Sequence, residues 1–261
     1  MTPNATTNST TSRQTLLRLE SLVVAFGGLV AVSDVDLDVA RGDRLAVLGP
    51  NGAGKTTLFN AIAGDITPTK GKVFIQGVDC SALPSRLRPQ LGVARTYQKT
   101  RLFAGLTVED NLYLAQTGKA RRHLSLWRSW RDVELRERAR EAAGEVWLDK
   151  ELASEVGNLS HGQQRQLEVG MALVTKPDLI MLDEPASGLS RGERERLIEL
   201  LENLPVETTL LLIEHDMDVA LKVANSVVVM ADGEKVASGS PDEIRNDPLV
   251  HAIYLGEQGA A

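Results

Sequence analysis

Hydrophobic and polar positions alternate in short runs over the first hundred residues, a pattern typical of β-strands. Leu16–Phe26 is rich in Leu and Val, and Val35, Leu37 and Val39 alternate with aspartates, which predicts a strand with one solvated face. Further strands are predicted for the short apolar runs Leu45–Leu48, Val73–Ile75 and Val93–Tyr97. We therefore expect antiparallel strands near the start of the fold.

Later in the chain the pattern is helical, or alternates between helices and short apolar strands. Thr56–Ala63 is predicted as a helix ended by Gly64, and the chain from Thr107 to about Leu148 is also helical. Apolar runs separated by helical stretches follow at Leu179–Leu182, Thr209–Ile213 and Val227–Met230. This alternation is typical of a parallel sheet covered on both faces. The predicted fold class is α/β, with a mixed or parallel sheet, an N-terminal antiparallel β subdomain and an inserted helical subdomain.

Within this class the chain divides into a tail and one domain. Residues 1–15 are mostly Thr, Ser and Asn and predict a disordered tail, while residues 16–258 predict a single domain. Its core would comprise residues 16–98 and 160–258, with the helical insert at residues 99–159.

Three pairs of residues have the spacing of a helix N-cap and its partner. They are Thr107 with Asp110, Ser160 with Gln163, and Ser190 with Glu193.

Composition narrows the class of protein further. The chain of 261 residues is 43% hydrophobic and 25% charged, as in ordinary globular proteins, and its net charge of −6 disfavours a nucleic-acid partner. Cys80 is the single cysteine, so no intrachain disulfide can form and a reducing compartment is expected. No apolar run is long enough to cross a bilayer.

One motif predicts a phosphate-binding loop. Residues 49–56, GPNGAGKT, match G-x-x-x-x-G-K-[ST] between a predicted buried strand and a predicted helix. Glycines let backbone N–H groups face phosphate oxygens, and the helix dipole adds positive potential. Lys55 would reach the β- and γ-phosphates of ATP, solvent-exposed without nucleotide, and the Thr56 hydroxyl would bind Mg²⁺. The predicted cofactor-binding residues are Gly49, Pro50, Asn51, Gly52, Ala53, Gly54, Lys55, Thr56 and Thr57.

Two carboxylates end a later apolar strand. Asp183 and Glu184 follow Leu179–Leu182, and strand ends of this kind lie at the sheet edge where open α/β folds bind ligands. Asp183 would hold Mg²⁺, directly or through water. Glu184 would act as the general base for the attacking water.

The segment 159–164, LSHGQQ, resembles the L-S-G-G-Q signature of ABC-type ATPases, and the resemblance extends over residues 16–255. It implies nucleotide contacts from Ser160, Gly162 and Gln163, and adenine stacking on Phe26, for which a core position is the alternative. It also implies that Gln98 senses Mg²⁺ and water at the Q-loop and that His215 contacts the γ-phosphate as the switch histidine. His161 in the signature, and SGLS in place of S-A-L-D at residues 187–190, depart from the common pattern.

The same resemblance implies a dimer, because the signature of one subunit completes the phosphate site of the other. The expected partners are a second ATPase subunit, identical or a paralogue, and integral-membrane permease subunits. A periplasmic solute-binding protein would act indirectly. The expected location is the cytoplasmic face of the inner membrane, as a peripheral protein.

A finer resemblance is to the ATP-binding subunits of bacterial branched-chain amino-acid importers. It rests on four segments, which are residues 26–32 (FGGLVAV), 95–111, 160–168 (SHGQQRQLE) and 253–256 (IYLG). The alternatives are importers of urea and short amides, a lipopolysaccharide-export ATPase, a soluble ABC protein and a P-loop kinase.

The segment Lys119–Arg131 is basic and contains no acidic residue. We expect it to face the permease or the membrane, and the alternative is a solvated surface.

Overall fold

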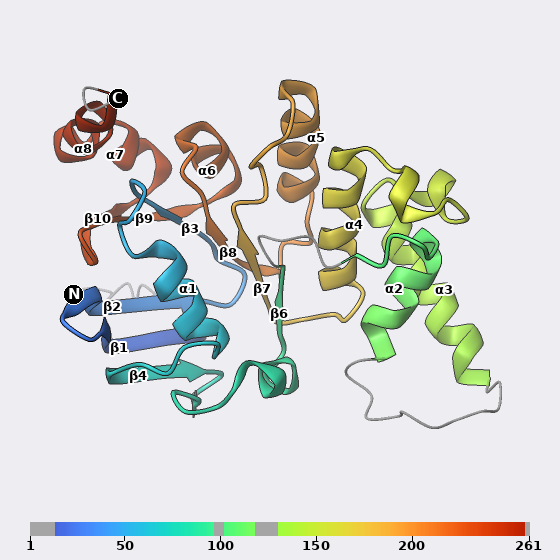
Figure 1. The fold of residues 1–261 in the computed structure, drawn as a ribbon, viewed down its shortest axis with the longest axis horizontal. Helices are drawn as coiled ribbons and strands as arrows, with labels where there is room; N and C mark the ends of the chain where they lie inside the picture. Colours follow the sequence, from blue (N-terminus) through green and yellow to red (C-terminus); the bar gives the residue numbers. More distant parts are fainter. Residues whose placement is uncertain (1–13, 97–101, 118–129, 259–261) are drawn as a thin grey trace, which may run out of the picture.

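The computed structural model of the protein describes residues 14–96, 102–117 and 130–258, which form two sheets and the helices around them (Figure 1). The antiparallel sheet, in the order β2-β1-β4-β5, contains β1 (Thr15–Phe26), β2 (Leu29–Ala40), β4 (Lys70–Ile75) and β5 (Val78–Asp79). The larger sheet has the order β10-β9-β3-β8-β7-β6. Its strands are β3 (Arg44–Leu48), β6 (Val93–Arg95), β7 (Leu179–Asp183), β8 (Thr209–Ile213), β9 (Ser226–Ala231) and β10 (Glu234–Gly239).

Helices occupy both the sheet core and a separate helical part. The core carries α1 (Lys55–Ala63), the 3₁₀ helix η1 (Ser85–Leu91), α5 (Arg191–Glu202), α6 (Met217–Val223), α7 (Pro241–Arg245) and α8 (Pro248–Gln258). The helical part consists of α2 (Val108–Thr117), α3 (Trp130–Glu145) and the short η2 (Asp149–Glu151) and η3 (Val156–Asn158), which lie beside α4 (His161–Leu173). The predicted α/β class, antiparallel start and helical insertion are confirmed.

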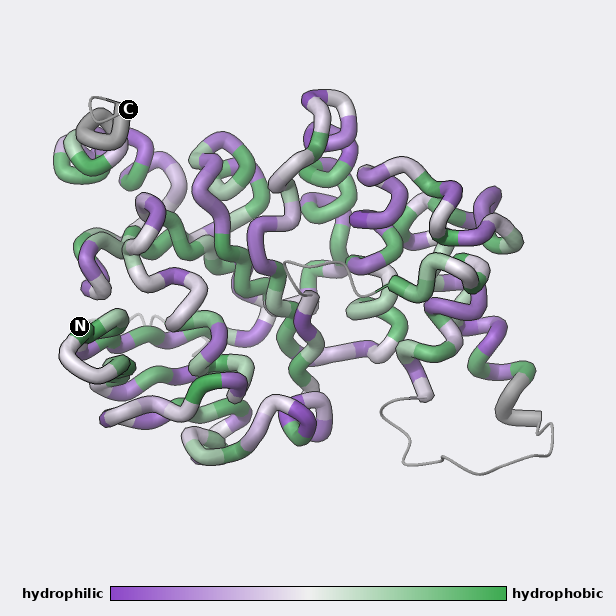
Figure 2. Tube along the Cα trace, viewed as in Figure 1, coloured by the Kyte–Doolittle hydropathy of each residue, from purple (hydrophilic) through white to green (hydrophobic). Residues whose placement is uncertain are grey.

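The strands of the larger sheet bury both of their faces. In β7, Leu179 and Met181 pack toward the antiparallel sheet and α1, while Ile180 and Leu182 pack toward α4 and α5. Successive side chains of a strand point to opposite faces, so a continuous apolar run fits a strand covered on both sides. Figure 2 shows the hydrophobic positions concentrated along these strands. No helix in the described ranges is long and apolar enough to cross a membrane.

Five parallel strands place their carboxyl ends at one edge of the sheet. β3 pairs in parallel with β8 and β9, and β7 pairs in parallel with β6 and β8. The segments that follow β3, β7 and β8 therefore meet, although they are far apart in the sequence. This edge is the position where open α/β sheets bind ligands.

The structure differs from the sequence-based expectation in a few elements. β10 pairs antiparallel with β9 and was not predicted, although Asp232 and Gly233 at the turn both have positive φ, as a two-residue hairpin requires. β2 begins at Leu29, six residues before the predicted alternation. Residues 1–13 of the predicted tail, Gln98, and residues 119–129 of the basic segment lie outside the described residues.

Candidate active site

The predicted phosphate loop lies between β3 and α1, and its backbone requires glycine at two positions. Gly49 has φ +149°, and a Cβ there would lie 2.2 Å from the Met230 carbonyl oxygen. Gly54 has φ +94°, and its Cβ would lie 2.3 Å from the Ala31 carbonyl oxygen. Helix α1 begins after Gly54 without a side-chain cap. Its first turn therefore presents backbone N–H groups to whatever anion occupies the loop.

Lys55 does not take the solvent-exposed position expected of it. The residue is only 5% exposed, and its Nζ donates to the carbonyl oxygens of Gly49 (2.6 Å) and Pro50 (2.9 Å). The expectation was wrong because two carbonyl groups of the loop accept hydrogen bonds from the ammonium group and hold it inside the loop. Thr56, the next residue, is exposed.

At the end of β7, Asp183 is buried and Glu184 holds a strained backbone. Glu184 has φ +44°, a backbone conformation that residues other than glycine rarely adopt. Its N–H donates to the Ile213 carbonyl oxygen at 2.9 Å. Burial raises the pKa of the Asp183 carboxyl, whereas the nearby positive charges of Arg95, and less so of Arg165 and Lys55, oppose that rise. The strand-end carboxylate and the loop lysine are thus within electrostatic range of each other.

His215 lies beside Glu184 at the same edge of the sheet. Its Nδ1 is 3.7 Å from Oε1 of Glu184, and the two side chains are 49% and 16% exposed respectively. The loop that carries His215 is fixed by Asp216, whose carboxylate caps α6 by accepting from the N–H groups of Asp218 (3.0 Å) and Val219 (3.3 Å). The structure therefore brings together Lys55, Asp183, Glu184 and His215.

Sequence reasoning missed Arg165, a residue of α4 that holds the backbone at this strand end. Its Nη2 donates to the carbonyl oxygens of Glu184 (2.9 Å) and Asp183 (3.1 Å), and its Nε donates to Pro185 (2.9 Å). Its Nη1 pairs with the Glu168 carboxylate, and both side chains are almost buried. One guanidinium thus binds three successive carbonyl groups. No motif spacing in the sequence signals these long-range contacts.

Glu214 was also missed, although it is next to His215 in the sequence. It is completely buried, and its Oε1 accepts from the Ala186 N–H at 3.0 Å, whereas Oε2 has no hydrogen-bond partner in the described part of the chain. Burial raises the pKa of its carboxyl. Glu214 thus links the loop after β8 to the loop after β7. A polar residue directly after a fully apolar strand is the sequence signal that could have found it.

Phe26 ends β1 at a hairpin next to the phosphate loop. Its side chain is 51% exposed, so the alternative of a core position is wrong. The neighbouring Leu29 is 66% exposed. The same hairpin approaches the phosphate loop through Ala31, whose carbonyl oxygen faces Gly54. An exposed aromatic ring beside a phosphate loop is available for stacking on a base.

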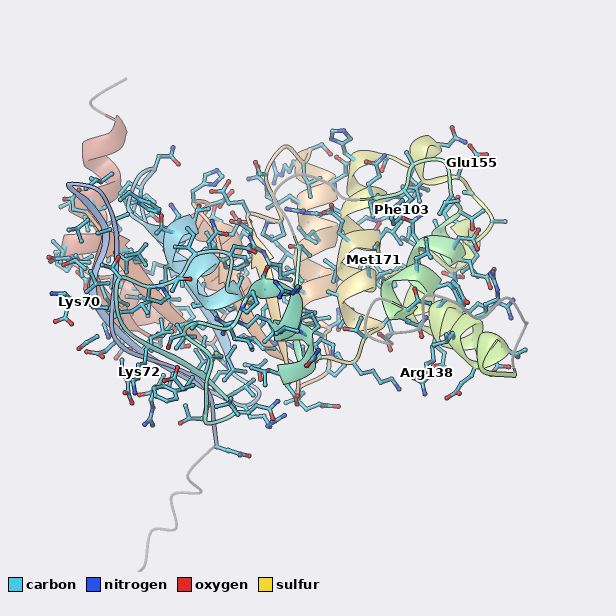
Figure 3. All side chains as sticks on the ribbon, turned by 60° about the horizontal axis from the view of Figure 1, so that its bottom comes forward. Lys70, Lys72, Phe103, Arg138, Glu155 and Met171 are labelled. Carbon is cyan, nitrogen blue, oxygen red and sulfur yellow. The ribbon has the colours of Figure 1, made fainter. Side chains whose placement is uncertain are left out.

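The signature residues lie at the start of α4, away from the phosphate loop. Ser160 caps the helix in a reciprocal pair with Gln163, as predicted, and the Gly162 N–H donates to Glu193 Oε1 at 2.9 Å. Figures 1 and 3 show α4 well apart from α1, with strands of the larger sheet between them. A single chain therefore does not bring Ser160, Gly162 and Gln163 to its own phosphate loop.

The side chains expected to hold Mg²⁺ supply the ligand type that this ion prefers. Thr56 offers a hydroxyl oxygen and Asp183 a carboxylate, both hard oxygen donors. No cluster of three or more His, Cys, Asp or Glu side chains able to hold a metal ion occurs among the described residues. This donor set fits Mg²⁺ bound jointly by a few protein oxygens and nucleotide phosphates.

Comparison with known proteins agrees with this geometry. Residues 32–187 match the family model described as ABC transporter, and residues 234–260 match the model described as branched-chain amino acid ATP-binding cassette transporter. The chain is 39% identical over 254 residues to the high-affinity branched-chain amino acid transport ATP-binding protein LivG of Salmonella typhimurium, covering 94% of this chain and 99% of that protein.

Solved structures give the same result. The ADP conformation of MJ1267, an ATP-binding cassette of an ABC transporter, superposes with a TM-score of 0.83 at 28% identity, covering 93% of this chain and 99% of that one. A dimeric post-hydrolysis state of the ATP-binding cassette MJ0796, bound to ADP and Pi, gives a TM-score of 0.71 at 25% identity, covering 87% and 99%. The chain belongs to the ATP-binding proteins of the ABC transporter family.

Proposed function

We propose that this protein is the ATP-hydrolysing subunit of an importer for branched-chain amino acids, working through a separate permease. The observation that carries the ATPase assignment is the convergence of Lys55, Asp183, Glu184 and His215 at one sheet edge, with His215 3.7 Å from Glu184. The observation that carries the cargo assignment is the similarity of the whole chain, C-terminal segment included, to branched-chain amino acid transport proteins.

Each residue has a distinct role in this proposal. The backbone of residues 49–54 binds the phosphates of ATP, and Lys55 exchanges its two carbonyl partners for β- and γ-phosphate oxygens. Glu184 accepts a proton from the attacking water, and His215 holds the γ-phosphate. Phe26 stacks on adenine, and Gln98 reports the state of the site to the permease.

Mg²⁺ would be held by Thr56, Asp183 and Gln98. When bound, the ion would supply positive charge to the phosphate oxygens. Asp183 is suited to this position because its buried carboxylate is supported by the positive charges of Arg95, Arg165 and Lys55. Thr56 contributes its exposed hydroxyl from the first turn of α1. Besides Gln98, the chain thus supplies one oxygen donor from α1 and one from the end of β7.

A second ATPase subunit would complete each site. Ser160, Gly162 and Gln163 are too far from the loop of their own chain, so their contact with nucleotide requires a partner, identical or a paralogue. The dimeric form of the similar cassette MJ0796 supports this arrangement. Two ATP molecules would then lie between two subunits, and hydrolysis would separate them.

The permease would bind at the cavity between the core and the helical part, placing the protein at the cytoplasmic face of the inner membrane. This cavity has a volume of about 670 Å³ and is lined by Arg86, Ala94, Leu102, Ala115, Glu168 and Met171, among other residues. The nearby Phe103 is 54% exposed, and Figure 3 shows Phe103 and Met171 on this side of the molecule. Residues 97–101, which include Gln98, connect β6 in the cavity wall to Leu102.

The experiment that tests the proposal is co-expression with the permease and solute-binding proteins that we expect to be encoded beside this chain, followed by reconstitution in vesicles. Leucine, isoleucine or valine with the binding protein should stimulate ATP hydrolysis, and the Glu184→Gln variant should abolish it. Stimulation by urea or a short amide instead would assign the chain to the alternative importers. Copurification with proteins of lipopolysaccharide export would contradict import.

A further inference from the structure

The first turn of α4 already holds a negatively charged group from its own chain. Glu193 Oε1 accepts from the Gly162 N–H at 2.9 Å. The side chain also lies across this glycine, since a Cβ on Gly162 would be 2.7 Å from Glu193 Cγ. Any side chain at position 162 would therefore displace Glu193, which gives Gly162 a packing role within one subunit.

Glu193 remains ionised at any pH at which the protein would operate. Hydrogen bonds from the Ser190 hydroxyl, the Gly162 N–H and the Ser190 N–H, together with the nearby Ser160, lower the pKa of its carboxyl from 4.5 to about 2. The carboxylate lies at the N-terminal end of α4, where the helix dipole favours a negative charge. It thus has the charge and the hydrogen-bond partner that a phosphate oxygen would have there.

Ser160 and Gln163 of this turn are also engaged within the chain. The Gln163 N–H donates to Ser160 Oγ at 3.2 Å, and Gln163 Oε1 accepts from the Ser160 N–H at 2.9 Å. A phosphate oxygen from outside must therefore replace an existing partner to bind Gly162. The partner that carries a like charge is Glu193.

We propose that Glu193 competes with the phosphate of the partner subunit's nucleotide for the Gly162 N–H and so sets the ATP concentration at which two subunits associate. This inference rests on the proposed function, in which two subunits share ATP. When the subunits meet, the carboxylate must either leave Gly162 or remain beside an incoming negative charge. Either event weakens association relative to a chain with a neutral side chain at this position.

The test uses the full chain with Glu184→Gln, which holds ATP without hydrolysing it in the proposed mechanism. Glu193→Gln is added because glutamine also serves at this position of a capping box but carries no charge. Glu195→Gln is the matched control, since Glu195 lies on the same helix, pairs with the exposed Arg191 at 3.1 Å and makes no hydrogen bond to α4. Sedimentation at increasing Mg-ATP concentration measures association.

We expect Glu193→Gln to lower the ATP concentration for half-maximal association about two- to fivefold, the typical effect of one charge at a helix end. Glu195→Gln should leave it unchanged. If Glu193→Gln needs the same or a higher ATP concentration for half-maximal association, this inference is wrong. The proposal of a shared nucleotide site would not be affected by that result. If the parent variant binds ATP but never associates, the shared site of the proposed function fails as well.

The capping of α5 by Glu193 needs a separate control, because the same side chain accepts from the Ser190 N–H at 3.1 Å. Ser190→Ala weakens this cap and keeps the carboxylate. If the competition is electrostatic, Ser190→Ala lowers the unfolding temperature without lowering the ATP requirement. If Ser190→Ala lowers the ATP concentration for half-maximal association as much as Glu193→Gln does, the inference is wrong. The effect would then come from loosened packing and not from the charge.

Discussion

His215 and Glu184 meet across the ends of two neighbouring parallel strands, with Nδ1 of His215 3.7 Å from Oε1 of Glu184. The pairing of β7 with β8 fixes this contact, because Asp183 lies opposite Ile213 and the Glu184 N–H donates to the Ile213 carbonyl oxygen. The backbone segments that carry the proposed general base and the histidine are therefore held by the same ladder. A shift of the Glu184 backbone would break its hydrogen bond to the buried strand β8.

Glu184→Gln should stop ATP hydrolysis and leave nucleotide binding in place. Glutamine keeps the shape of the side chain but cannot accept a proton from water, so we expect turnover to fall at least about 100-fold. Single-turnover hydrolysis and binding of a fluorescent ATP analogue, measured on the same preparation, check both parts. Hydrolysis at the wild-type rate would remove Glu184 as the general base.

Lys55→Ala should also abolish hydrolysis, with a different effect on binding. The variant loses the positive charge that lies 2.6 Å from the Gly49 carbonyl oxygen and that would neutralise the phosphates, so both affinity for ATP and turnover fall, the latter by about 100-fold or more. Lys72→Ala, an exposed substitution on β4, is the control. Circular dichroism and an ATP titration distinguish loss of the site from loss of the fold.

Arg165→Lys should lower both stability and turnover. A single ammonium group cannot bind three carbonyl groups and the Glu168 carboxylate together, so we expect a loss of about 2–4 kcal/mol in the free energy of unfolding. Denaturant unfolding and steady-state hydrolysis are the measurements. The double variant Arg165→Gln with Glu168→Gln removes both charges of this pair. It should recover part of the stability but not the turnover, and recovery of both would contradict a positioning role.

Glu214→Gln should change how stability depends on pH. Burial raises the pKa of Glu214 in the folded state above the ordinary value of 4.5. This shift contributes to the free energy of unfolding in full below about pH 4.5. The contribution is lost as the pH rises through the folded-state pKa. The free energy of unfolding of the wild type, relative to Glu214→Gln, should therefore fall as the pH rises above about 4.5 and through the folded-state pKa. Denaturant unfolding at several pH values checks this. If the free energy of unfolding of the wild type relative to Glu214→Gln instead increases with pH, the argument from burial is wrong.

Local patterns predicted most of the fold. The apolar runs at Leu179–Leu182 and Thr209–Ile213 became β7 and β8, and the Ser160 and Ser190 caps formed as predicted, because these signals depend on a few adjacent residues. The contacts of Arg165 depend on packing between α4 and the end of β7, which no local pattern encodes. The buried position of Lys55 depends on carbonyl groups whose direction is known only once the loop is folded.

Motif positions predicted which residues meet at the sheet edge, and the resemblance implied that the signature residues serve the phosphate site of another subunit. Lys55, Asp183, Glu184 and His215 follow strands β3, β7 and β8, and parallel neighbours place their ends together. The sequence also predicted the Gln163 cap of α4. It could not predict that Glu193 would cross from α5 to the Gly162 N–H, since Glu193 has an equally good local partner in Ser190.

The hydrogen bonds of Arg165 have a mechanical consequence. This side chain joins α4 to the carbonyl groups of Asp183, Glu184 and Pro185. A displacement of the signature helix would therefore act directly on the backbone that bears the proposed general base. In a pair of subunits, the start of this helix would contact the neighbour's nucleotide, while Glu184 would face the subunit's own. Arg165 would then be one route by which occupancy of either nucleotide site reaches the other.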